Sequence, residues 1–242
     1  MRVVANAWRE TTCPLCFGWV LIAMFDLQED LKDLVPQVVS AREGSVAIRP
    51  MRRSKRIFDI AVALMLLPLL AVIAALLLVL NPLFNQGALT YRQTRMGLGG
   101  RPFTAFKFRT MRHAAAHTRG AFDGLEKDRI SRLGGLLRRC RIDELPQVLN
   151  VLRRDMSLIG PRPDLYDHAR VYQQQVPGYA ARHQIMPGIS GFAQTEVGYV
   201  DGIDGIRRKV AADLYYITHA TFRFDLWIAW RTLCVIAGRK GQ

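Results

Sequence analysis

Two adjacent carboxylates, Asp143 and Glu144, lie in a strongly basic part of this 242-residue chain. The segment RISRLGGLLRRCR, residues 129–141, precedes them, and Arg162 follows between two prolines. A carboxylate can attack phosphorus and form a covalent aspartyl phosphate. A guanidinium group can bind two phosphate oxygens at once. The pattern therefore predicts chemistry on a phosphate group, with Asp143 as the candidate nucleophile.

The residues after Asp143 predict how its carboxylate is positioned. Pro146 follows closely, and proline is tolerated in the first turn of a helix. We therefore expect Asp143 at the N-cap of a helix that continues through QVLNVLR, with Leu149 on its buried side. Backbone N–H groups at a helix start favour phosphate and an ionised carboxylate. The alternative is that Asp143 only caps this helix. With Asp143 as the nucleophile, Glu144 is a candidate ligand for a divalent cation, which prefers oxygen atoms.

Two further segments carry cations suited to phosphate. In SLIGPRP the prolines restrict the backbone, so Arg162 is presented from a stiff loop. In RPFTAFKFRTM, residues 101–111, alternation places Lys107 and Arg109 on the same face of a predicted strand. An edge strand with solvated charges is the alternative interpretation. The MGLGG segment, residues 96–100, predicts a hairpin turn before that strand.

An uncharged apolar run of 21 residues, 60–80, precedes these segments. As a helix it would be about 32 Å long, enough to cross a bilayer core. Lysines and arginines flank it on both sides, and such flanks stay on the cytoplasmic face. Pro68 would kink the helix. We therefore predict a re-entrant membrane helix over about residues 57–82; a single-pass anchor and a buried core helix are the alternatives.

The composition narrows the possible partners. Lysine and arginine total 34 and aspartate and glutamate 20, giving a net charge of +14 that implies an anionic partner. We expect no nucleic acid, because there is no recognition-helix or zinc-finger pattern and the apolar run argues against it. Cys13 and Cys16 form a lone C-x-x-C, a weak signal for zinc. Nothing suggests a disulfide framework, which fits a reducing cytoplasmic setting.

The two ends of the chain differ in character. Residues 1–50 include an apolar stretch too short to span a membrane, and Met51 then opens a basic segment. We expect residues 1–50 to be an extension, or an upstream start chosen in error, ahead of a domain at 51–242. Residues 224–238 predict an apolar helix whose tryptophans lie either at the lipid headgroups or in a core. MPGISGFAQ, residues 186–194, is interpreted as a turn and a short apolar stretch.

Taken together, these motifs resemble the bacterial sugar transferase family, the monotopic polyprenyl-phosphate sugar-1-phosphate transferases. The resemblance covers about residues 54–235 and is carried by KRIFDIAVAL, YRQTRMGLGGRPFTAFKFRTM, LLRRCRIDELPQVLNVLRRDMSLIGPRP, MPGISGFAQ and KVAADLYYITHATFRFDLWIAWRT. Many members carry Ser-Pro at the membrane kink, where this chain has Leu67-Pro68.

The resemblance implies a two-step reaction at the inner membrane. Asp143 would attack the β-phosphorus of a nucleotide diphosphate sugar, commonly a UDP-sugar, with release of UMP. The phosphosugar would then pass to polyprenyl (undecaprenyl) phosphate and start a lipid-linked polysaccharide. Asp143 and Glu144 match the family's dyad and would bind Mg²⁺. The residues expected to bind substrate are Lys107, Arg109, Arg138 and Arg162.

The expected fold is α+β and mostly helical. It comprises the membrane-embedded helix, a small β-element and amphipathic helices at the cytoplasmic face of the bacterial inner membrane. A different class of function stays open on the sequence alone, namely a non-catalytic basic adaptor at the membrane surface in envelope polysaccharide assembly. The dyad and the Pro-Arg-Pro loop favour the enzyme.

Overall fold

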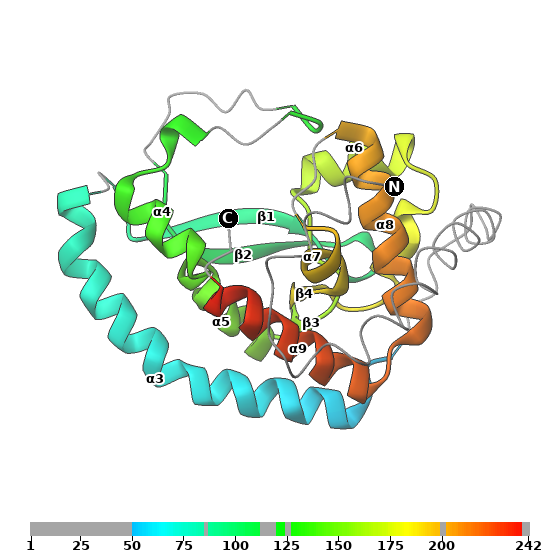
Figure 1. Cartoon of the computed structure of the whole chain (residues 1–242), viewed down its shortest axis with the longest axis horizontal. Helices are drawn as coiled ribbons and strands as arrows, with labels where there is room; N and C mark the ends of the chain where they lie inside the picture. The colour runs from blue at the N-terminus through cyan, green and yellow to red at the C-terminus, as the bar shows by residue number, and fades with distance from the viewer. Residues whose placement is uncertain (1–49, 85–86, 112–119, 124–126, 199–201, 239–242) are drawn as a thin grey trace. The chain divides into compact units, whose positions relative to one another are not determined.

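The computed structural model describes residues 50–84, 87–111, 120–123, 127–198 and 202–238, which all fall within one compact unit, Ala41–Gln242. Predictions for residues 1–49, including the Cys13–Cys16 pair, lie outside the described residues. Most of the described chain is helical, as expected (Figure 1). The α-helices are α3 (Arg53–Phe84), α4 (Arg132–Arg139), α5 (Val148–Leu152), α6 (Tyr166–Gln175), α7 (Phe192–Glu196), α8 (Gly202–His219) and α9 (Phe222–Ala237).

Two small sheets complete the fold. Strands β1 (Thr90–Met96) and β2 (Pro102–Phe108) pair antiparallel, and the 3₁₀ helix η2 (Leu98–Gly100) joins them. The predicted hairpin is thus confirmed. Its turn requires glycine, because Gly99 and Gly100 have φ values of 63° and 75°.

Strands β3 (Ser157–Ile159) and β4 (Gly188–Ser190) pair in parallel. The interpretation of residues 186–194 as a turn was wrong at Gly188, which begins β4. The backbones approach so closely here that a Cβ atom on Gly188 would lie 2.1 Å from the Gly160 nitrogen. Only glycine fits this contact, which holds the segment after β3 against β4.

Helix α3 is a continuous helix of 32 residues that passes along one side of the fold (Figure 1). It packs through two apolar clusters. In the first, Ala63 lies with Val148 and Val151 of α5, and in the second, Leu77 lies with Phe108 at the end of β2. Helix α3 therefore packs against α5, which follows the helix that carries Asp143, and against the end of β2, the strand that carries Lys107.

Polar contacts fix the beginning of α3. The Arg56 guanidinium donates to the carbonyl oxygens of Val151 (2.7 Å) and Leu152 (3.2 Å). The buried Asp59 carboxylate accepts a hydrogen bond of 2.7 Å from the Ser157 hydroxyl in β3. These contacts tie the amino-terminal end of α3 to α5 and β3.

The rest of α3 exposes large apolar side chains. Within α3 only Asp59, Ala63, Leu77 and Asn81 are buried, so the interpretation as a buried core helix is wrong. In the described part of the chain, α3 is the one helix long and apolar enough to cross a membrane. It bends along its length in Figure 1, and Pro68 supplies a physical cause for a bend. The re-entrant path stays a prediction.

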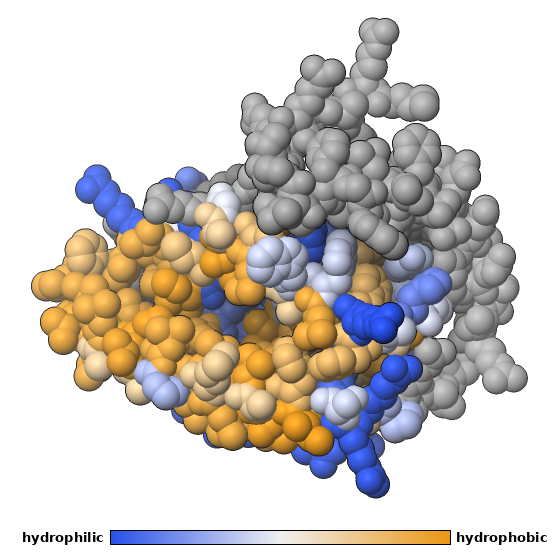
Figure 2. Space-filling view, turned by 60° about the horizontal axis from the view of Figure 1, so that its bottom comes forward, coloured by the Kyte–Doolittle hydropathy of each residue, from blue (hydrophilic) through white to orange (hydrophobic). Residues whose placement is uncertain are grey.

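Helix α9 has one packed and one exposed face. Ile228 is fully buried, whereas Leu226, Trp230 and Leu233 are exposed, with 53% of the Trp230 surface accessible. The packed face agrees with the core interpretation, and contact of the exposed face with lipid headgroups stays a prediction. Figure 2 shows a broad apolar surface on the side of the molecule where α3 runs, and hydrophilic atoms inside a hollow of that surface.

Candidate active site

Asp143 and Glu144 lie in a 3₁₀ helix, η4 (Ile142–Gln147), that leads into α5. The prediction that Asp143 is an N-cap was wrong: Arg141 occupies that position with φ 54°, and no side chain caps the helix. Pro146 has no N–H and therefore donates no hydrogen bond within this turn, which the start of a helix tolerates. The interpretation of Asp143 as a mere capping residue is therefore also wrong.

The short helix α5 orients η4 over β2 through an asparagine that no sequence pattern predicted. Asn150 is fully buried. Its side-chain oxygen accepts from the Phe106 N–H (3.1 Å), and its amide donates to the Thr104 carbonyl (2.7 Å). Asn150 thus binds the free edge of β2. Leu149, predicted on the buried side, is 36% exposed because the helix presents Val148 and Val151 to the core instead.

Glu144 is buried and held by two cations. The Lys107 ammonium donates to Oε1 at 2.6 Å. The Arg162 guanidinium forms a two-point contact, with Nη1 donating to Oε2 at 2.8 Å and Nη2 donating to Oε1. Burial alone would raise the pKa of Glu144, but attraction by Arg162 and Lys107 outweighs it and lowers this pKa well below its usual value. Glu144 is therefore ionised.

Asp143 experiences a different environment. Its side chain is buried, yet no described residue donates a hydrogen bond or forms a salt bridge to its carboxylate. Burial raises the pKa of Asp143, against the attraction of Lys107 and with repulsion from Glu144. Hence one carboxylate of the dyad is bound by cations, and the other keeps its oxygen atoms available.

Further cations lie close to the dyad. Arg138, at the end of α4, attracts Asp143 and donates from Nε to the Thr110 hydroxyl at 2.9 Å. Arg141, which the site prediction did not include, has Nη1 4.0 Å from Glu144 Oε2. Its buried Nε has no hydrogen-bond partner in the described part of the chain. In the sequence, only the run of arginines before the dyad indicated that Arg141 could belong to the site.

The structure therefore brings Lys107, Arg138 and Arg162 together around the dyad, as predicted. The contacts described for Arg109 lie elsewhere, because its Nε donates to the Ala88 carbonyl at 2.8 Å. Strand β2 ends at Phe108, so the alternation that was expected to align Arg109 with Lys107 stops one residue too early. Binding of substrate by Arg109 stays a prediction.

The chemistry of the donors fits a hard divalent cation such as Mg²⁺. The Asp143 oxygen atoms are not engaged by the described residues, and Mg²⁺ commonly takes one or two carboxylates while keeping several waters. Glu144 would have to share its oxygen atoms with Lys107 and Arg162. The described residues contain no group of three or more metal-ligating side chains. The metal stays a prediction.

The chain is similar to known bacterial proteins over most of its length. A model of the family "bacterial sugar transferase" matches residues 51–239. A UDP-glucose:undecaprenyl-phosphate glucose-1-phosphate transferase of Caulobacter vibrioides is 38% identical over 219 residues, covering 88% of this chain and 79% of that protein.

Two longer relatives are similar over a smaller share of their length. A UDP-N-acetylgalactosamine-undecaprenyl-phosphate N-acetylgalactosaminephosphotransferase of Aeromonas hydrophila is 38% identical over 182 residues, 75% of this chain and 43% of that protein. A UDP-glucose:undecaprenyl-phosphate glucose-1-phosphate transferase of Escherichia coli K12 is 35% identical over 185 residues, 75% of this chain and 40% of that protein. The chain thus spans less than half the length of these two relatives.

Proposed function

We propose the following function for this chain, which belongs to the bacterial sugar transferase family. It is a glycosyl-1-phosphate transferase that moves a sugar-1-phosphate from a UDP-sugar to undecaprenyl phosphate. The names of the relatives support this reaction, since all three act on a UDP-sugar and undecaprenyl phosphate. The product begins a lipid-linked polysaccharide.

Asp143 is the nucleophile. One of its carboxylate oxygens attacks the sugar-bearing β-phosphorus, and the bond from that phosphorus to the bridging oxygen breaks, so UMP leaves with the electron pair. An oxygen of undecaprenyl phosphate then attacks the same phosphorus and releases the Asp143 carboxylate. The observation that carries this proposal is the contrast within the dyad: Asp143 is unpaired among the described residues, whereas Glu144 is bound by Lys107 and Arg162.

The surrounding cations neutralise the donor. Four cations lie around the two dyad carboxylates and exceed their charge by two, namely Lys107, Arg138, Arg141 and Arg162. The diphosphate of a nucleotide sugar carries about two negative charges at neutral pH, so the charges are complementary. Phosphoryl transfer depends mainly on positioning and on charge neutralisation. The buried setting strengthens the charge neutralisation, because a low dielectric increases the attraction between charges.

Glu144 keeps Lys107 and Arg162 at a fixed place beside Asp143. Mg²⁺, held by Asp143 and Glu144, would add positive charge next to the diphosphate. The described contacts of Glu144 support the positioning role directly, since both of its carboxylate oxygens accept hydrogen bonds from the two cations.

The lipid substrate reaches the site from a membrane. The exposed apolar side chains of α3 and the stripe Leu226, Trp230 and Leu233 of α9 support insertion into the bacterial inner membrane, with the catalytic residues on the cytoplasmic side. Helix α3 enters and leaves on that same face. The hydrophilic hollow within the apolar surface in Figure 2 supports entry of a lipid-linked phosphate.

The test uses the full chain in membranes with radiolabelled UDP-sugars and undecaprenyl phosphate. We expect a diphosphate-linked lipid and UMP to form in equal amounts with at least one UDP-sugar of a panel. Asp143→Asn should abolish both products, and the exposed control Asp204→Asn should not. Membrane binding without UMP release for every UDP-sugar would instead favour the non-catalytic adaptor.

A further inference from the structure

In the loop that presents Arg162, every backbone carbonyl from residue 161 to residue 164 accepts a hydrogen bond. The backbone N–H of Gly188 donates to the Pro161 carbonyl at 3.0 Å. At the other end, the backbone N–H of Met96 donates to the Asp164 carbonyl at 3.1 Å. The two ends of the loop are thus bound to β4 and to β1.

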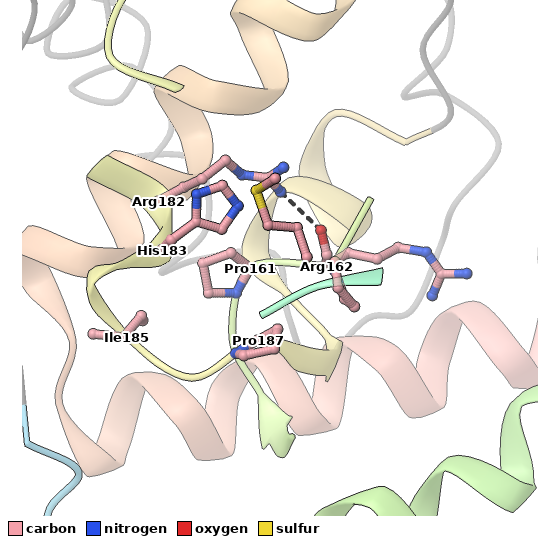
Figure 3. A pocket seen from close by; sticks show the side chains of 8 residues that line it. Pro161, Arg162, Arg182, His183, Ile185 and Pro187 are labelled. Carbon is pink, nitrogen blue, oxygen red and sulfur yellow. Dashed lines mark hydrogen bonds between the residues drawn. The ribbon is translucent and has the colours of Figure 1, made fainter. Parts of the chain in front are cut away.

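The two carbonyls in the middle are held by arginine side chains. Arg95 Nη1 donates to the Pro163 carbonyl. Arg182 Nη2 donates to the Arg162 carbonyl at 2.8 Å, as the dashed line in Figure 3 shows. In the same view the Arg162 guanidinium points away from Arg182. Arg182 therefore holds the backbone of Arg162 and leaves its side chain to contact Glu144.

Arg182 is itself locked in place by carboxylates. Its side chain is 1% exposed. The Asp213 carboxylate accepts from Nε at 3.0 Å and from Nη2 at 2.6 Å, and Asp164 Oδ2 accepts from Nη1. Tyr179 lies against the guanidinium and accepts from Nη1 at 3.1 Å. A buried guanidinium held from two sides cannot shift without breaking ion pairs.

We propose that Arg182 is a positioning residue for the transfer reaction and that Asp213 orients it. Contacts run in sequence from Asp213 to Arg182, from Arg182 to the Arg162 carbonyl, and from the Arg162 guanidinium to Glu144. The described hydrogen bonds and ion pairs of Arg182 include neither member of the dyad. Its effect on catalysis therefore passes through Arg162. This inference rests on the proposed function, in which Arg162 neutralises the donor diphosphate.

The main alternative is that the Arg182 ion pairs only stabilise the fold. The two roles differ in how Arg182 and Arg162 couple. A positioning residue loses its effect once the group that it positions is gone, whereas a stability effect persists. The measurement is therefore a double-mutant cycle of Arg182→Lys and Arg162→Ala, made on the full chain by single-turnover transfer of labelled donor so that slow variants remain measurable.

Arg182→Lys keeps the positive charge between Asp164 and Asp213 but loses the planar fork that also reaches the Arg162 carbonyl. We expect it to slow transfer about tenfold or more in the otherwise unchanged chain, because small misplacements at a reacting centre cost up to about 10²-fold. In the Arg162→Ala background the same change should cost less than about twofold. Asp213→Asn, a second and independent variant, should show the same non-additive pattern.

A matched control comes from an arginine with similar contacts elsewhere. Arg56 also donates to backbone carbonyls, those of Val151 and Leu152, and none of its described hydrogen bonds reaches the 161–164 loop. Whatever Arg56→Lys costs should be the same with and without Arg162. Thermal midpoints of all variants, measured alongside, separate loss of folded protein from loss of rate.

The possible outcomes separate this inference from the proposed function. If Arg182→Lys and Asp213→Asn slow transfer equally with and without Arg162, Arg182 does not act through Arg162 and the inference is overturned, while the proposed function stands. If Arg162→Ala transfers at the rate of the unchanged chain, there is nothing for Arg182 to position, and the role proposed for Arg162 fails as well.

Discussion

Asp143 and Glu144 are neighbours in the chain, yet their carboxylates are bound in opposite ways. Glu144 accepts hydrogen bonds from Lys107 and Arg162 through both oxygens, whereas no described residue donates to Asp143. The pKa of Asp143 is raised and that of Glu144 lowered. Groups whose environments push their pKa values apart usually have different roles. Here Glu144 organises the cations, and Asp143 is left to react.

Replacing Asp143 should stabilise the protein while abolishing activity. A carboxyl whose pKa is raised on folding contributes stability that is present below its unfolded pKa, about 3.9, and lost as the pH rises through its folded pKa. At neutral pH the ionised Asp143 therefore costs stability. We expect Asp143→Asn to raise the thermal midpoint by about 2–4 °C, the shift for about 1 kcal/mol at this chain length. The gain should vanish at acidic pH; a lower midpoint at pH 7 would contradict the account.

Replacing Glu144 should have the opposite effect on stability. Its lowered pKa means that the stability it contributes is present above its unfolded pKa, about 4.3, and is lost as the pH falls through its folded pKa. Glu144→Gln leaves Lys107 and Arg162 buried without their partner, a change that typically costs about 3 kcal/mol. Chemical unfolding in detergent measures this loss in the free energy of unfolding.

The matched control for that change is Glu196→Gln. Glu196 pairs with Arg231 alone at 3.3 Å, and both side chains are more accessible than Glu144. Its loss should cost less than about 1 kcal/mol. Equal costs for the two variants would argue against a special role of Glu144 in holding the cations.

The rate should fall in alkaline solution because of Lys107. Burial lowers the pKa of Lys107 to about 8, although Glu144 opposes the shift. Above that pH the ammonium loses its charge, so binding of the donor diphosphate weakens. We expect kcat/KM for the UDP-sugar, which reports the free enzyme, to decline as the pH rises past about 8. In Lys107→Arg the decline should move to higher pH; an unchanged profile would exclude Lys107 as its source.

Both ends of α3 should face the cytoplasm. Ile57 and Leu83, near its two ends, are exposed. In a chain whose own cysteines are replaced by serine, Ile57→Cys and Leu83→Cys should react with a membrane-impermeant thiol reagent only after the inner membrane is opened. Labelling of either position from the periplasmic side of intact spheroplasts would favour the single-pass anchor instead.

The sequence predicted which residues lie close together better than it predicted their local geometry. Lys107, Glu144 and Arg162 meet because the motifs that carry them pack together, and the hairpin before Lys107 follows from glycine-rich turn chemistry. The N-cap prediction for Asp143 failed because the helical turn already begins at Ile142, after Arg141 in a left-handed conformation.

The remaining parts of the site depend on contacts between distant segments. In the sequence, Asn150 is a polar residue within an apolar helix. Only the structure shows that it binds the edge of β2. Arg182 and Asp213 are 31 residues apart, and no spacing rule joins them. The parallel pairing of β3 with β4 likewise becomes visible only in three dimensions.

The central claim is that Asp143 carries the phosphosugar between the two half-reactions. The most direct measurement mixes the full chain with UDP-sugar labelled in the β-phosphate, omits undecaprenyl phosphate, quenches rapidly in acid and maps the label by peptide mass spectrometry. We predict a phosphosugar on the peptide containing Asp143 that disappears on addition of undecaprenyl phosphate. Label on any other residue, or rapid transfer to lipid with no labelled protein at any time, would contradict it.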